Sequence, residues 1–221
     1  MCGIIGIISE EDVSSSIYES LTVIQHRGQD AAGMATLEDG KLHVRKQIGL
    51  VREVFRAQHI KNLKGKMGIG HVRYPTAGGV TREFSQPLYV NSPYGISICH
   101  NGNLVNSKEL TQELYENDLR HLNTDSDSEV ILNIFANEMQ KINSQSPSPE
   151  EIFSAVEKMH LRLKGAYSVV LMISGVGLLA IRDPNGIRPL MMGKKENDLL
   201  GKTDYMLSLI HISEPTRPYL I

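Results

Sequence analysis

The chain of 221 residues has only two cysteines, Cys2 and Cys99, and no tryptophan. Two cysteines cannot form a disulfide framework or a cysteine-based zinc site, and such scarcity is typical of proteins in a reducing compartment. We therefore expect a cytoplasmic protein whose fold depends on its apolar core and not on covalent cross-links.

Long apolar runs and strong charge are also missing. No stretch reaches the ~18 apolar residues of a membrane span, and the N-terminus lacks the positively charged start of a signal peptide. The formal net charge of −2 gives no reason to expect nucleic acid or an acidic membrane surface as a partner. With 41% hydrophobic residues, the chain can still bury the core of one large domain.

The first nine residues combine a cysteine with an apolar run. Removal of Met1, which a small second residue permits, would place a thiol and a free α-amine together on Cys2. Such an amine has a pKa of roughly 7.7–8.0, so part of it is unprotonated near neutral pH and can accept the thiol proton. The apolar run predicts a buried strand that would hold the nucleophile rigidly. A small buried cysteine in an ordinary first strand is the alternative interpretation.

The remaining pattern predicts an alternation of strands and helices. Asp39-Gly40 between two short runs is a hairpin signal, and Ser126 and Glu129 have the spacing of a capping box at the start of a helix. Hairpin-type connections argue for antiparallel sheets, and two sheets covered by helices are the economical arrangement.

Polar residues follow two of the predicted strands and open one helix. The forked guanidinium of Arg73 suits a carboxylate, although a surface salt bridge is the commoner role of a lone arginine. Asn101 and Gly102 have amides that can stabilise an oxyanion, although Asn-Gly is also a common turn. Asp127 lies in a first helical turn, where the helix dipole alone favours an acid.

Six motifs stand in the order of one known family: Met1-Cys2-Gly3-Ile4, His26 to Gly33, Gly70 to Thr76, His100 to Leu104, Thr124 to Glu129 and Arg182 to Leu190. Over roughly residues 1–206 the chain resembles the N-terminal glutaminase domain of the amidophosphoribosyltransferase family. The resemblance implies an N-terminal-nucleophile hydrolase fold, an α+β fold built as a four-layer α/β/β/α sandwich of two antiparallel sheets.

The resemblance also implies a catalytic group. Cys2, as the mature N-terminus, would attack the side-chain amide of L-glutamine, and its α-amine would act as base and then as acid. Asn101 and Gly102 would hold the oxyanion.

Substrate-binding residues are implied in the same way. Arg73 would bind the glutamine α-carboxylate and Asp127 its α-ammonium. Arg27 lies in a loop that resembles the family's glutamine-site lid, and Tyr74 and Thr76, in the motif after Arg73, are further expected contacts.

In the full-length enzyme, the resemblance implies that the ammonia converts PRPP to 5-phosphoribosylamine in the first committed step of de novo purine biosynthesis. That enzyme is expected to be a homo-oligomer. We expect no cofactor and no iron–sulfur cluster in this fragment. Mg²⁺ and PRPP are expected only in the full enzyme, through a phosphoribosyltransferase domain whose acidic PRPP motif does not occur here.

Two alternatives remain. Glucosamine-6-phosphate synthase and glutamine-dependent asparagine synthetase share the fold and the cysteine chemistry, although the motifs from Arg27 to Asp30 and from Arg182 to Leu190 favour the purine-pathway family. The other alternative is an inactive structural remnant of the same domain. Against a remnant, the predicted nucleophile and its predicted partners are all present.

The family pattern ends at Met206. The eleven residues from Leu207 to Arg217 match the in-frame translation of a transposase sequencing adapter. We therefore expect a C-terminally truncated glutaminase domain over residues 2–206, followed by a sequencing-adapter artefact over residues 207–221. A genuine divergent tail is the alternative.

Overall fold

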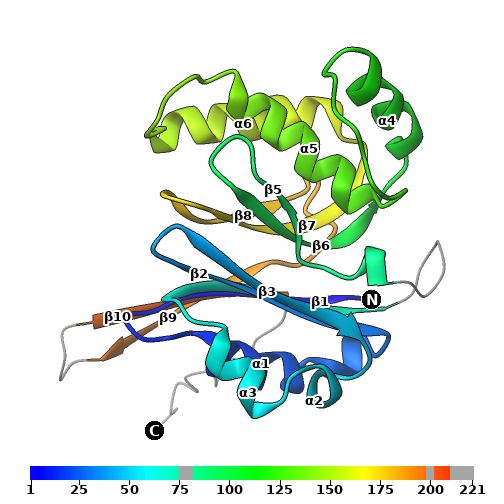
Figure 1. Ribbon diagram of the computed structural model, residues 1–221. Helices are drawn as coiled ribbons and strands as arrows, with labels where there is room; N and C mark the ends of the chain where they lie inside the picture. Colours follow the sequence, from blue (N-terminus) through cyan, green and yellow to red (C-terminus); the bar gives the residue numbers. More distant parts are fainter. Residues whose placement is uncertain (75–81, 198–201, 210–221) are drawn as a thin grey trace, which may run out of the picture.

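Two antiparallel sheets lie face to face in the centre of the computed structural model, which describes residues 1–74, 82–197 and 202–209. Helices cover the outer face of each sheet, so the layers follow one another as helix, sheet, sheet, helix (Figure 1). The predicted four-layer sandwich of two antiparallel sheets is therefore confirmed.

The larger sheet contains the N-terminal strand. Its six strands are β1 (Gly3–Ile8), β2 (Ala31–Glu38), β3 (Lys41–Ile48), β4 (Met67–Arg73), β9 (Met191–Asn197) and β10 (Lys202–Ser208). Their order is β3-β2-β4-β1-β10-β9, and the helices of this half are α1 (Ser14–Val23), α2 (Val51–Val54) and α3 (Ala57–Asn62). Because β1 pairs with β4 on one side and β10 on the other, the first strand is a central strand.

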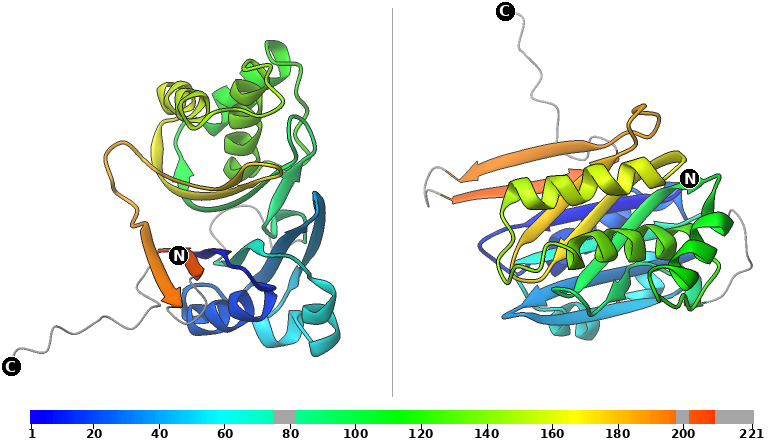
Figure 2. Two further views of the ribbon diagram at one scale, coloured as in Figure 1. Left: turned by 90° about the vertical axis from the view of Figure 1, so that its left-hand side faces the viewer. Right: turned by 90° about the horizontal axis from the view of Figure 1, so that it is seen from above.

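The smaller sheet has the order β5-β6-β7-β8. Its strands are β5 (Leu88–Val90), β6 (Ile96–Leu104), β7 (Gly165–Ile173) and β8 (Gly177–Arg182), and its helices are α4 (Ser107–Glu116), α5 (Asp127–Gln140) and α6 (Pro149–Arg162). Seen from above, α5 and α6 lie side by side across this sheet (Figure 2). Two short 3-10 helices, η1 (Gln25–Arg27) and η2 (Arg82–Phe84), complete the described elements.

The core has one apolar cluster between the sheets and one beneath each helical layer. Ile4 of β1, Ile69 of β4 and Cys99 of β6 belong to the central cluster and are fully buried. Cys99 therefore has a packing role. Helix α5 is buried on nearly all sides from Ser128 to Met139, which makes it the central helix of its layer.

The hairpin predicted around Asp39-Gly40 is confirmed. It joins β2 to β3, and both turn residues have positive φ angles, +48° and +77°, as a type I′ turn requires. The predicted capping box of α5 is wrong. Ser126 accepts a hydrogen bond from the Ser128 N–H, but the Glu129 carboxylate reaches back to the N–H groups of Asn123 and Thr124 and fastens the preceding loop.

The predicted boundary at Met206 lies inside β10. Leu207 and Ser208 pair with Gly6 and Ile5 of β1, and Leu207 and Leu209 are buried. Paired backbone thus extends two residues beyond Met206. The adapter origin of residues 207–221 stays a prediction, and residues 210–221 lie outside the described part of the chain.

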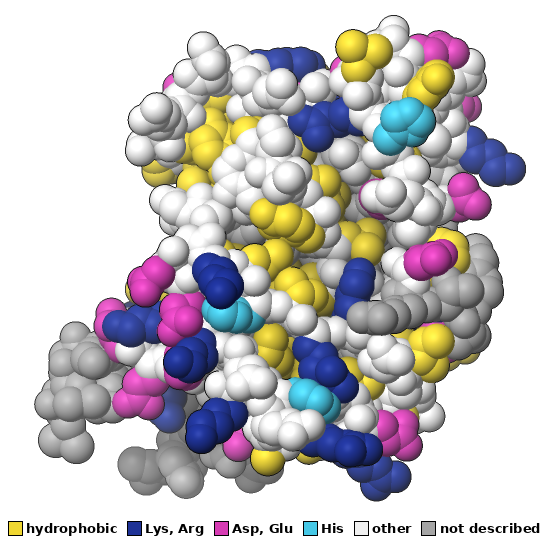
Figure 3. Space-filling model, in the orientation of Figure 1, with side chains coloured by type: hydrophobic (Ala, Val, Ile, Leu, Met, Phe, Trp, Pro, Cys, Tyr) yellow, Lys and Arg dark blue, Asp and Glu magenta, His cyan; other side chains and the backbone are white. Residues whose placement is uncertain are grey.

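Basic side chains gather over β3 and the short helices below it, in the lower half of the face in Figure 3. β3 is an edge strand and carries Lys41, Arg45 and Lys46. Charge on an edge strand opposes pairing with a second chain. Arg45 and Lys46 also fasten neighbouring segments to this edge, through the carbonyls of Val54, Ser85 and Pro87. Among the described helices, none is long and apolar enough to cross a membrane.

The buried α5 layer gives a first prediction. Phe135→Ala should lower the free energy of unfolding by roughly 3–5 kcal/mol, because Phe135 is fully buried and truncation leaves a cavity. Phe153→Ala on α6 is the matched control, since Phe153 is 61% exposed, and it should change stability by no more than about 0.5 kcal/mol. Urea denaturation measures both. Equal losses in the two variants would contradict the described packing.

Candidate active site

Cys2 lies directly before β1, beside the end of β4. Its neighbour Gly3 is paired with Val72, and the Tyr74 N–H donates to Cys2 Sγ at 3.4 Å. A Cβ on Gly3 would lie only 2.7 Å from a methyl group of Val72, so a larger residue there would displace the cysteine. The position of the predicted nucleophile is therefore fixed by sheet pairing.

The thiol of Cys2 favours its protonated form. Burial raises its pKa, and the nearby Asp127 carboxylate adds to the increase. The hydrogen bond from Tyr74, the N-terminal ammonium and Arg73 act in the opposite direction but do not outweigh burial. A base is therefore required to generate the thiolate near neutral pH.

The far end of β6 supplies the predicted oxyanion residues. Asn101 is 3% exposed, and among the described residues its Nδ2 group has no acceptor. A Cβ on Gly102 would lie 2.2 Å from the Ala166 carbonyl oxygen, so this position accommodates only glycine. A buried amide without a partner is the kind of donor that a developing negative charge can use.

Asp127 lies in the first turn of α5, the helix that covers the smaller sheet. One carboxylate oxygen accepts the Leu104 N–H at 3.1 Å, and the other lies 3.6 Å from His100 Nδ1. The side chain is 21% exposed. The carboxylate is thus held by β6 and remains accessible from the cleft.

Behind these residues lies a buried polar network that the sequence analysis missed. The His100 N–H donates to Gln86 Oε1 at 2.6 Å, and Gln86 Nε2 donates to Ser128 Oγ at 2.9 Å. His100 Nδ1 lies 2.9 Å from the same hydroxyl, and His71 Nε2 lies 3.2 Å from the His100 carbonyl. The network joins β4, β6 and α5. In the sequence, the only sign of this network was that His100 directly precedes the predicted oxyanion residue Asn101. No sequence feature pointed to Gln86.

Arg73 is at the end of β4 and forms a buried ion pair. Its Nη1 group lies 2.6 Å from Asp30 Oδ2, both side chains are 8% exposed, and the guanidinium lies 5.4 Å from the centre of the Phe84 ring. Arg73 also lines the cleft described below. The ion pair fixes the direction of the guanidinium, but Asp30 was not among the predicted site residues.

The remaining predicted residues have different placements. Arg27 Nε donates to the Cys2 carbonyl at 3.0 Å, so Arg27 contacts the nucleophile's backbone and does not line the cleft. Tyr74 lines the cleft. Thr76 lies outside the described residues.

One open cleft brings most of the predicted site together. From the predicted set, it is lined by Cys2, Arg73, Tyr74, Asn101, Gly102 and Asp127. A cation and an anion thus face the same space as a thiol and an unpaired amide. Within the described parts of the chain, no group of three or more His, Cys, Asp or Glu side chains could hold a metal ion.

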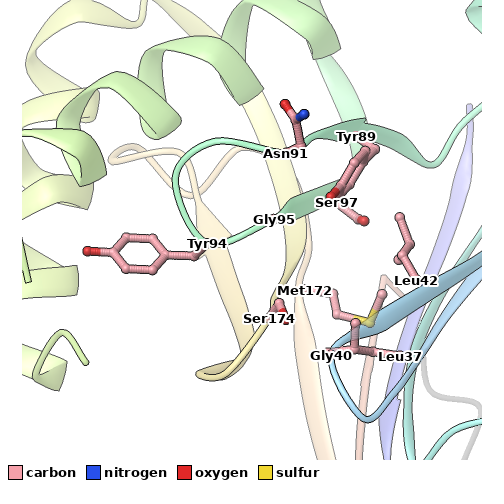
Figure 4. A pocket seen from close by; sticks show the side chains of 10 residues that line it. All are labelled: Leu37, Gly40, Leu42, Tyr89, Asn91, Tyr94, Gly95, Ser97, Met172 and Ser174. Carbon is pink, nitrogen blue, oxygen red and sulfur yellow. The ribbon is translucent and has the colours of Figure 1, made fainter. Parts of the chain in front are cut away.

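A second pocket lies at the opposite end of the sandwich, between the β2–β3 turn and the start of β6 (Figure 4). Its lining includes Leu42, Tyr89, Ser97 and Met172 and no charged side chain. The Tyr94 ring points away from the others, and its hydroxyl donates to the Ser144 carbonyl. This pocket lacks the charges that would recognise an amino acid.

The two face-to-face antiparallel sheets with helices on their outer faces (Figure 1) are the sandwich expected of an N-terminal-nucleophile hydrolase. The sequence model of the glutamine amidotransferase domain matches residues 79–202, and the chain belongs to that family.

Relatives narrow the comparison further. The chain is 52% identical to an amidophosphoribosyltransferase of Pseudomonas aeruginosa over 94% of its own length and 41% of that protein. The structure of a glutamine phosphoribosylpyrophosphate amidotransferase from B. subtilis, complexed with ADP and GMP, matches 94% of the chain and 41% of its own at a TM-score of 0.75 and 33% identity. A structure described as the allosteric regulatory enzyme of purine biosynthesis matches 94% of this chain and 42% of its own. Its TM-score is 0.78 and its sequence identity is 35%. The chain thus spans about two fifths of these relatives.

His71 in the buried network gives the second prediction. Burial lowers its pKa to about 3. The hydrogen bond to the His100 carbonyl acts against this, whereas the charges of the His100 ring, Arg73 and Lys46 act in the same direction as burial. The ring should therefore show no titration by NMR between about pH 8 and pH 5, where an ordinary histidine titrates at about 6.5. The unfolded chain gains a proton in this range and the folded chain does not, so stability decreases as the pH falls from about 6.5 toward 3. A ring that titrates at its ordinary pKa would contradict the buried, neutral assignment.

Proposed function

We propose that the cleft hydrolyses the side-chain amide of L-glutamine, with Cys2 as nucleophile. One observation carries the proposal: Cys2 lines the same cleft as the unpaired Asn101 amide and the opposite charges of Arg73 and Asp127. Free glutamine has a carboxylate and an ammonium at one end and an amide at the other. The three kinds of group in the cleft complement these three features.

The reaction begins with loss of Met1, which makes the α-amine part of Cys2. The amine accepts the thiol proton, and Sγ attacks the amide carbon of glutamine. The carbonyl oxygen gains a negative charge, which the Asn101 Nδ2 group and the Gly102 N–H stabilise. The α-ammonium then donates its proton to the leaving nitrogen. The C–N bond breaks, ammonia leaves, and a thioester remains on Cys2.

Water completes the cycle. The α-amine takes a proton from the water, whose oxygen attacks the thioester carbon through the same oxyanion site. Breakage of the C–S bond releases glutamate and returns the proton to Cys2 Sγ. The Tyr74 N–H, which already donates to Sγ, stabilises the thiolate at both steps in which it forms.

Arg73 and Asp127 bind the other end of the substrate in this proposal. Arg73 is oriented by Asp30, and Asp127 by the Leu104 N–H. Because a protein partner fixes each charged group, less side-chain freedom is left to be lost on binding.

We further propose that, in a full-length protein like the matched relatives, the ammonia is used to convert PRPP to 5-phosphoribosylamine. The matched relatives support this step, since they are named as amidophosphoribosyltransferases. The PRPP site, and the Mg²⁺ expected with it, would belong to the part of those relatives that this chain does not span.

The third prediction concerns the oxyanion site. Asn101→Ala should lower kcat for glutamine hydrolysis by about 100- to 1,000-fold, because one donor to the oxyanion is lost, with KM little changed. Asn91→Ala, which removes an exposed amide at the far end of the sandwich, is the matched control. Release of ammonia and glutamate by the chain without Met1 measures both. An Asn101→Ala variant as active as the control would refute the assigned oxyanion site.

A further inference from the structure

Arg188 reaches the cleft from the loop after β8 and has no part in the reaction described above. Its Nη1 group lies 3.0 Å from Met1 Sδ. Its Nε atom is buried and, among the described residues, has no hydrogen-bond partner. A thioether is only a weak acceptor. Within the described part of the chain, no strong hydrogen bond therefore accounts for the position of the guanidinium beside the N-terminus.

The loop that carries Arg188 is anchored on both sides. The buried Asp183 carboxylate accepts the Arg188 N–H at 3.1 Å, and Arg182 Nε donates to the Arg188 carbonyl at 2.5 Å. Ser168 of β7 donates to the carbonyl of the following proline at 2.8 Å. Burial raises the pKa of Asp183, but the hydrogen bonds that its carboxylate accepts from backbone N–H groups have the larger effect, so the pKa is lowered. These hydrogen bonds fix the backbone of the loop and thereby hold the Arg188 side chain close to the N-terminus.

A second guanidinium lies on the other side of the nucleophile. Arg27 Nε donates to the Cys2 carbonyl at 3.0 Å. Burial lowers the pKa of the Met1 α-amine, the Cys2 thiol group acts against this, and Arg27 and Arg188 lower it further. Asp127 and Arg73, the other charged groups that act on Cys2, face it from α5 and β4.

We propose that Arg188 is a positioning residue whose charge, held over the N-terminus, keeps the α-amine of Cys2 in the unprotonated form that accepts the thiol proton. The proposal rests on the function proposed above, in which that amine is the base. Arg188 and Cys2 line the same cleft, so once Met1 is removed the guanidinium and the new α-amine of Cys2 face the same space. Two like charges repel, and protonation of the amine becomes less favourable.

The test compares Arg188→Gln, Arg188→Met and Arg188→Lys in the chain without Met1, with Arg52→Gln as the charge-matched control. Arg52 is exposed on α2, behind the larger sheet. Competitive acetylation of the Cys2 α-amine as a function of pH, read by mass spectrometry, gives its titration curve. We expect the Gln and Met variants to titrate at higher pH than the unaltered chain. The Lys variant and the control should titrate as the unaltered chain does.

Hydrolysis provides a second readout. Glutamine turnover by the Gln and Met variants should be several-fold slower at neutral pH and should recover as the pH rises. An unchanged amine titration in these variants would overturn the proposal. A higher KM with an unchanged pH profile would also overturn it, because Arg188 would then bind substrate. The amine titration needs no glutamine, so it distinguishes failure of this proposal from failure of the proposed function.

Discussion

The pairing of β1 between β4 and β10 is the constraint on which the site depends. It places Gly3 opposite Val72 and thereby holds Cys2 against the Tyr74 backbone at the end of β4. The second sheet packs on the first through Ile4, Ile69 and Cys99, which brings the end of β6 to the same edge. A nucleophile at a chain terminus is otherwise free to move, and here the sandwich removes that freedom.

Buried polar bonds set the direction of the site's side chains. Asp30 orients Arg73, and the Leu104 N–H orients Asp127. His100 and Gln86 tie β6 to Ser128 at the start of α5, so hydrogen bonds join the strand with the oxyanion residues to the helix with Asp127. Such a network supports residues that must keep a fixed geometry during a reaction.

The sequence predicted the layers, the β2–β3 hairpin and most of the cleft, because apolar periodicity, turn chemistry and motif order are local signals. Contacts between residues far apart in the sequence could not be predicted. Asp30 meets Arg73 across 43 residues, and Gln86 meets Ser128 across 42, through contacts that only the folded sheets create. Glu129 shows the same limit. Its spacing from Ser126 fitted a capping box, but in the folded chain its carboxylate accepts a hydrogen bond from the Asn123 N–H in the preceding loop. Thr76 lies outside the described residues.

The central claim is that Cys2 is the nucleophile of a cleft shaped for glutamine. The most direct measurement is treatment of the chain with a glutamine-mimicking diazoketone, followed by intact mass and peptide mapping. The account predicts a single adduct on Cys2 in the chain without Met1, slowed by excess glutamine, and none on the fully buried Cys99. A chain without Met1 whose Cys2 reacts no faster than it does after denaturation would contradict the account.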